Sequence, residues 1–145
     1  MARATYHYSA FELAPDEAHP SGSTAHRPLI LATVTAPGGA WFPCLALADS
    51  GADVCLFPFK LAVQLQLDIE NLPKSLTGGV GSAANLTYYD TVSIDLGDGI
   101  KFSAYVGFTQ GLDAAGFGLL GQSGFFEQFR VEFDHKRKTF SIESV

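Results

Sequence analysis

Glycine and proline divide this chain into short segments. The 145 residues include 15 Gly and 7 Pro, spread along the whole length, and the stretches between them are rich in Val, Ile, Leu, Phe, Tyr and Thr. Short β-prone stretches separated by turn-forming residues are typical of all-β folds. A chain of this length fits one compact domain. We therefore expect a single all-β domain spanning residues 1–145.

The pattern along the chain predicts where the elements lie. A polar segment rich in Pro, Ser and Gly at residues 12–28 predicts a flexible loop. Residues 60–67 fit both a strand and a short helix, and we favour the helix. Phe125, Phe126 and Phe129 follow Ser123 at helical spacing, which predicts a second helix over residues 122–129. The expected strands are 4–9, 29–35, 41–48, 86–96, 100–108, 130–133 and 139–142.

Charge and composition exclude several classes of function. The net charge is −6, whereas neutralising nucleic-acid phosphates requires a basic surface, so we expect no nucleic-acid partner. The basic residues between 130 and 138 are interrupted by Glu132 and Asp134, which favours an exposed hairpin. No apolar run approaches the length of a membrane span, and no secretory signal is visible. We expect no membrane association and a cytoplasmic location.

The spacing of the histidines predicts no metal site, and the cysteines predict no disulfide framework. A disulfide between Cys44 and Cys55 is geometrically possible, but two cysteines make no disulfide framework, and we favour two small buried side chains. The histidines have no spacing typical of metal ligands. They are His7, His19, His26 and His135.

The most informative motif is the apolar run 45–48 that ends in Asp49, Ser50, Gly51 and Ala52. An unpaired carboxylate at the end of a buried strand is costly unless it is neutralised or finds a partner. A second carboxylate that shares a proton with Asp49 would remove the cost of burying this charge, but the chain has no second copy of the motif. A second molecule would have to supply that carboxylate. Residues 117–121 are weakly similar to this motif, because they too are largely apolar and end in glycine.

Three elements, in this order, resemble the retropepsin-like aspartic proteases, which are single-domain relatives of pepsin that act as homodimers. The segment 48–53 resembles the family's active-site turn of Asp, Thr or Ser, Gly and Ala. Residues 78–81 (Gly-Gly-Val-Gly) resemble the glycine-rich tip of the flap. Residues 119–121 (Leu-Leu-Gly) resemble the segment before the C-terminal helix. The resemblance implies a closed, barrel-like β domain with one short C-terminal helix and an active site at the homodimer interface.

The same resemblance implies an aspartic endopeptidase that needs no cofactor and binds an extended peptide or protein substrate. Two copies of Asp49 would activate water between them, Ser50 would bond across the two-fold axis, and Gly51 would let substrate approach the backbone. The implied substrate-binding residues are Ala52, Asp53, Leu56, Gly78, Gly79, Val80, Gly81, Phe117 and Leu119.

The chain also departs from the family pattern. Gln122 stands where many viral members carry an Arg that pairs with the residue equivalent to Asp53, so a weaker hydrogen bond between Gln122 and Asp53 is expected. The chain continues into a hairpin longer than the viral C-terminal strand. We therefore expect a dimer interface that is built differently from that of the viral enzymes.

Two other hypotheses remain. A retropepsin-like module that dimerises or binds peptides without hydrolysing them would tolerate Asp49→Ala with its partner affinity intact. An unrelated small β-barrel whose Asp-Ser-Gly is a chance turn would be a monomer. Trp41 and the Phe-rich segment are expected to be core or dimer contacts.

Overall fold

The computed structural model describes residues 2–77 and 85–145, and in them the chain is built almost entirely of strands. The strands are β1 (Arg3–His7), β2 (Ser9–Leu13), β3 (Ser23–Arg27), β4 (Leu29–Thr35), β5 (Trp41–Ala48), β6 (Leu56–Pro58), β7 (Lys74–Thr77), β8 (Asn85–Asp95), β9 (Lys101–Thr109), β10 (Gly118–Leu120), β11 (Phe129–Asp134) and β12 (Thr139–Ser144). The helical elements are α1 (Phe59–Gln64) and two 3₁₀ turns, η1 (Ile69–Asn71) and η2 (Gln110–Leu112). The all-β prediction is confirmed, and β4 and β5 have the predicted bounds.

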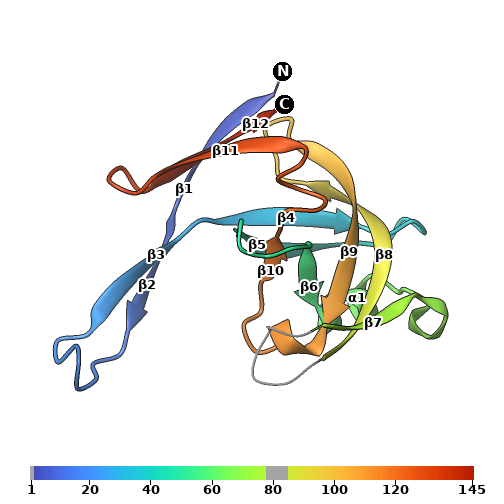
Figure 1. The fold of residues 1–145 in the computed structure, drawn as a ribbon, viewed down its shortest axis with the longest axis horizontal. Coiled ribbons are helices and arrows are strands. Elements are labelled where there is room, and N and C mark those ends of the chain that lie inside the picture. The colour runs from blue at the N-terminus through green and yellow to red at the C-terminus, as the bar shows by residue number, and fades with distance from the viewer. Residues whose placement is uncertain (1, 78–84) are drawn as a thin grey trace.

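The largest sheet curls into a closed barrel. Its strand order is β4-β5-β10-β6-β9-β8-β7, and β4 also pairs with β8. That second pairing, with Val34 opposite Ile94, joins the two sides of the sheet. The long β8–β9 hairpin turns at Gly97, Asp98 and Gly99, all three of which have positive φ, and it wraps around one side of the barrel (Figure 1). A single closed barrel leaves few strand edges open to water.

Alternating side chains of these strands fill the barrel interior. Ala32 and Val34 of β4 are fully buried, and so are Phe57, Phe108 and Leu120 from strands across the barrel. This alternation of buried and exposed positions is expected of strands with one face on a core. Trp41, expected in the core or at a dimer contact, is 64% exposed in the single chain and is therefore not a core residue.

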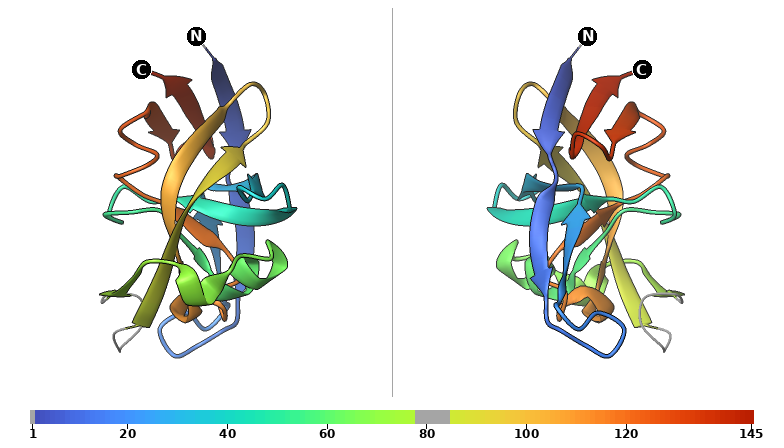
Figure 2. Two further views of the ribbon diagram at one scale, coloured as in Figure 1. Left: turned by 90° about the vertical axis from the view of Figure 1, so that its right-hand side faces the viewer. Right: turned by 90° about the vertical axis from the view of Figure 1, so that its left-hand side faces the viewer.

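A second sheet joins the two ends of the chain. Its order is β1-β12-β11, and the N- and C-termini lie close together at one end of the molecule (Figures 1 and 2). Phe140 and Ile142 of β12 are buried in the common core. The rings of Phe102 in β9 and Phe129 in β11 meet edge-on at 5.2 Å, so this sheet closes one end of the barrel.

The structure corrects the prediction of a loop over residues 12–28. Strands β2 and β3 form a two-stranded antiparallel hairpin, in which Phe11 pairs with Ala25 and Leu13 with Ser23. Only residues 14–22 connect the two strands. The polar composition of this segment, with its Pro and Ser, predicted no strand. The alternating positions of β3 are occupied by Thr, Ala and His rather than by large apolar residues.

The predicted helices have different outcomes. The segment 60–67 is helical in its first part, as α1. The helix over 122–129, which would have been the C-terminal helix of the domain, is wrong: the segment is a series of turns. Gly124 has a φ of +101°, outside the helical region. The spacing of Phe125 and Phe129 instead serves the core, where their rings lie 5.4 Å apart.

Candidate active site

Asp49 directly follows β5 and begins a tight turn. Its backbone amide donates to the carbonyl of Leu120 at 3.0 Å, and its own carbonyl accepts from the Ala52 amide at 3.1 Å. The carboxylate oxygen Oδ1 accepts a hydrogen bond from the backbone amide of Gly51 at 3.0 Å. The side chain is half-buried. The turn therefore fixes both the backbone and the carboxylate of Asp49.

The turn is held against the residues that follow β10. The amide of Gln122 donates to Ala52 O at 2.8 Å, and the amide of Ser123 donates to Asp53 O at 2.9 Å. Gly121 lies so close to this turn that a Cβ on it would be 2.2 Å from the carbonyl oxygen of Val54. Glycine is required at position 121 because a side chain would push the two segments apart.

The two segments of similar sequence, which end at Asp49 and at Gly121, pair directly in the sheet. Strands β5 and β10 are parallel neighbours, with Leu119 opposite Leu47 and Leu120 opposite Ala48. The two similar segments therefore end side by side, one in Asp49 and the other in Gly121. This parallel pairing of segments distant in sequence is what positions the Asp49 turn.

A row of leucines crosses the sheet beside Asp49. Leu29 pairs with Leu47, Leu47 with Leu119, and Leu119 with Leu56, so the four side chains share one face of four adjacent strands. Leu47 and Leu119 are half-buried, whereas Leu29 and Leu56 are buried. Phe117, also half-buried, lies in the segment directly before β10, two residues before Leu119. The row provides an apolar wall at the end of β5 that leads into the Asp49 turn.

Sequence reasoning missed Leu29 and Leu47. Leu47 could have been found, because residues two apart in a strand point to the same side, and Leu47 lies two residues before Asp49. Leu29 depends on the register between β4 and β5, which the sequence does not specify. Of the expected substrate-binding residues, Leu56 and Leu119 belong to this wall. Phe117 directly precedes β10, and Ala52 and Asp53 lie in the turn itself.

The expected hydrogen bond between Gln122 and Asp53 is absent from the described contacts. Gln122 Nε2 instead donates to the backbone carbonyl of Ser50 at 2.8 Å, while Asp53 is exposed and interacts through its backbone carbonyl. The Gln122 amide is neutral and reaches a carbonyl in the turn, so it braces the turn without needing a carboxylate. Ser50 itself is exposed.

Cys55 lies buried beneath the turn. Its Sγ accepts from the amide of Gly121 at 3.3 Å, and burial raises its pKa to about 11. The thiol therefore stays protonated at neutral pH and is a poor nucleophile. Both cysteines are free, but the prediction of two small buried side chains is confirmed only for Cys55, because Cys44 is half-buried.

The expected flap-tip residues Gly78, Gly79, Val80 and Gly81 lie outside the described residues. The strands on either side of them, β7 and β8, pair in antiparallel register up to Thr77 opposite Asn85. Within residues 2–77 and 85–145, no three His, Cys, Asp or Glu side chains gather as a metal site, and no helix is long and apolar enough to cross a membrane.

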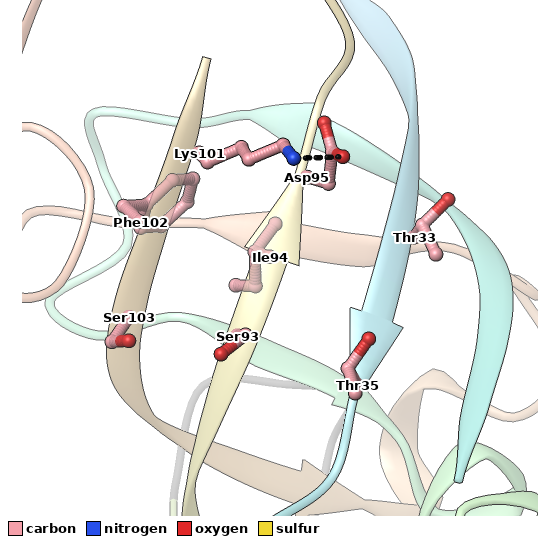
Figure 3. A pocket seen from close by; sticks show the side chains of 8 residues that line it. All are labelled: Thr33, Thr35, Ser93, Ile94, Asp95, Lys101, Phe102 and Ser103. Atoms are coloured by element: carbon pink, nitrogen blue, oxygen red, sulfur yellow. Dashed lines mark ion pairs between the residues drawn. The ribbon is translucent and has the colours of Figure 1, made fainter. Parts of the chain in front are cut away.

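A separate hollow of about 360 Å³ opens on the outside of β4, β8 and β9 (Figure 3). Thr33, Thr35, Ser93 and Ser103 place hydroxyl groups around it. The Lys101 and Asp95 side chains form an ion pair at its rim, at 3.6 Å. Exposed ion pairs of this kind contribute at most about 1 kcal/mol. This hollow contains neither Asp49 nor the leucine row.

Comparisons with known proteins support the fold. No protein-family model and no curated protein sequence matches the chain. Among solved structures, the crystal structure of a retropepsin-like aspartic protease from Rickettsia conorii is similar, with a TM-score of 0.54 and 19% sequence identity. The alignment covers 92% of this chain and 98% of that chain. The chain therefore has a retropepsin-like all-β fold.

Proposed function

We propose that this chain is one half of a homodimeric aspartic endopeptidase. The observation that carries the proposal is the placement of Asp49, a half-buried carboxylate in a turn that is hydrogen-bonded to the end of β10. The fold similarity to an aspartic protease supports the same assignment. A rigid turn is what a catalytic carboxylate requires, because small displacements of a reacting group lower the rate strongly.

The second carboxylate is proposed to come from another copy of the chain. Among the described residues, the one hydrogen bond to the Asp49 carboxylate comes from the Gly51 amide. A two-fold axis beside the turn would bring two copies of Asp49 together. Two carboxylates about 3 Å apart share one proton and titrate as a pair.

The chemistry follows from that shared proton. The ionised Asp49 takes a proton from a bound water as the water oxygen attacks the carbonyl carbon of the scissile peptide bond. The protonated Asp49 hydrogen-bonds the carbonyl oxygen and stabilises the negative charge that develops there. When the tetrahedral intermediate collapses, the Asp49 that took the proton from water gives it to the nitrogen, the C–N bond breaks, and the pair again shares one proton. The products are a carboxylic acid and an amine.

The leucine row indicates the class of side chain that would be accepted. Leu47 and Leu119 are the partly exposed members of the row and are the surfaces that a substrate side chain would touch. An apolar wall favours apolar substrate side chains, at about 25 cal/mol per Å² buried. An extended peptide would pair its backbone as an added strand. We propose cleavage between hydrophobic residues.

The test is a cleavage assay with a mixed peptide library from about pH 4 to pH 7, the range in which such carboxylate pairs work. Wild type is compared with Asp49→Asn and with Asp98→Asn, a matched change in the exposed β8–β9 turn, where Asn tolerates the positive φ of +52°. Cleavage by wild type and Asp98→Asn but not Asp49→Asn, blocked by a statine-type transition-state mimic, supports the protease. Peptide binding by all three proteins without cleavage at any pH would instead indicate a binding module.

A further inference from the structure

The hairpin of β2 and β3 stands apart from the rest of the fold. We refer to residues 9–27 as the arm. In Figure 1 the arm extends away from the barrel, and its two strands form a sheet of their own. A two-stranded hairpin is marginally stable by itself in water. The arm therefore needs a surface to pack against, and its own barrel does not supply a third strand.

The arm has one apolar face. Phe11 and Ala25 are opposite each other in the register, and Leu13 follows on the same face, with its side chain 44% exposed. The guanidinium of Arg27 lies over the Phe11 ring, 4.9 Å from its centre. The opposite face is polar, and there Thr24 donates to the Glu12 carboxylate at 3.1 Å. An amphipathic hairpin of this kind suits a protein surface rather than free solution.

The base of the arm is adjacent to the Asp49 turn. Pro28, directly after the arm, accepts a hydrogen bond through its carbonyl from the amide of Ala48 at 3.1 Å. Ala48 immediately precedes Asp49. The arm therefore leaves the barrel within one or two residues of the candidate catalytic carboxylate.

That position determines what the arm can meet in a dimer. If two Asp49 carboxylates lie about 3 Å apart, the residue steps between Asp49 and Pro28 put the base of each arm within roughly 10 Å of the two-fold axis. Five paired residues at about 3.3 Å each make the arm roughly 17 Å long before its turn is added. The arm is longer than its distance from the axis and points away from its own barrel. An arm that begins this close to the axis and points away from its own barrel is long enough to reach a second copy of the chain.

We infer that the arm is a dimerisation element whose apolar face, with Phe11 and Leu13, packs against a second copy of this chain. The inference rests on the proposed function, because the two-fold axis is placed by the pairing of two Asp49 side chains. Each active site then depends on contacts made by both arms, because removal of an arm weakens the dimer that brings the two Asp49 carboxylates together.

The main test shortens the arm. Ser9 and Arg27 are paired residues, so replacing residues 10–26 by Asn-Gly closes the hairpin with a two-residue turn and leaves β1 and β4 in place. The dimer dissociation constant is measured by sedimentation at several protein concentrations, alongside circular dichroism and peptide cleavage. A second variant, Leu13→Asp, changes only one exposed side chain. Val63→Asp is its matched control, because Val63 is 58% exposed on α1, away from the arm.

We expect the shortened variant to dimerise at least about a hundredfold more weakly and Leu13→Asp about tenfold more weakly, as for loss of a central apolar contact. Val63→Asp should leave the constant unchanged. Equal dimerisation of wild type, Leu13→Asp and a folded shortened variant would overturn the inference, even if all of them cleave peptide. A wild type that is monomeric at every concentration would overturn it too. A wild-type dimer that is weakened by arm changes but cleaves nothing would retain the arm and reject the protease.

Discussion

The backbone amide of Asp49 donates a hydrogen bond to the carbonyl of Leu120, at 3.0 Å. This bond joins the end of β5 to the end of β10, two segments far apart in the sequence that run parallel in the sheet. The candidate catalytic carboxylate is therefore positioned by the backbone of a distant strand. Substitutions that separate these two segments should affect activity and stability together.

Gly121→Ala is the most direct way to separate them. The added Cβ would be 2.2 Å from Val54 O and 2.8 Å from Ala52 O, both backbone atoms that cannot rotate away. We expect the free energy of unfolding, measured in urea, to fall by roughly 3 kcal/mol, as for overpacking of a tight site. Gly38→Ala is the control, because nothing lies within 4 Å of a Cβ there. An equal, small change in both variants would show that the close approach at Gly121 does not constrain the fold.

Gln122→Ala tests the side chain that braces the turn. Gln122 Nε2 donates to Ser50 O at 2.8 Å from an exposed position, and such a bond contributes about 0.5–1.5 kcal/mol. We expect kcat/KM for peptide cleavage to fall about three- to tenfold while the protein stays folded. Gln64→Ala, at an exposed position of α1, should leave kcat/KM unchanged. A wild-type rate in Gln122→Ala would mean that backbone bonds alone hold the turn.

Leu119→Ala tests whether the leucine row contacts substrate. Leu119 is half-buried between Leu47 and Leu56. Removing most of its side chain should lower kcat/KM roughly 10- to 100-fold for substrates with Leu or Val at the adjoining position, and less for substrates with larger aromatic side chains. The measurement is the ratio of kcat/KM values between the two substrate types, with Val63→Ala as control. A loss of stability with an unchanged ratio would make Leu119 a core residue only.

Cys55 gives a pH dependence of stability with a defined sign. Burial raises its pKa from 9.0 to about 11 in the folded state, so between these values the unfolded chain has lost the thiol proton and the folded chain retains it. The unfolded state then binds fewer protons, and stability falls as pH rises from 9 to 11. Urea unfolding across this range should show a steeper fall in wild type than in Cys55→Ala. Parallel curves would contradict the assignment.

The sequence predicted the local features of the fold well and the long-range ones less well. Residues 29–35 and 41–48 alternate or run apolar between clear turn signals, and both strands were predicted to the residue. The arm was missed because β3 lacks large apolar side chains. The helix over 122–129 was wrong because Gly124 and the close approach at Gly121 impose turns where the Phe spacing alone fits a helix.

In the candidate site, too, the local features could be predicted from the sequence and the long-range contacts could not. Asp49 could be identified from the motif alone, because a lone carboxylate after an apolar run demands a partner. The bond from Gln122 to Ser50 could not, since it depends on the parallel pairing of β5 with β10. Leu29 enters the apolar wall only through the register of β4 with β5. Contacts set by register between distant strands are the part that the sequence pattern leaves open.

The central claim is that each active site uses one Asp49 from each of two chains, and mixed dimers test it most directly. Wild type and Asp49→Asn are unfolded together, refolded at varied ratios and fixed total concentration, and assayed for peptide cleavage. If both carboxylates are required, activity should follow the square of the wild-type fraction, leaving about one quarter at an equal mixture. Activity that falls in direct proportion to the wild-type fraction, leaving about one half at an equal mixture, would show that a single chain carries a complete site and would contradict the account.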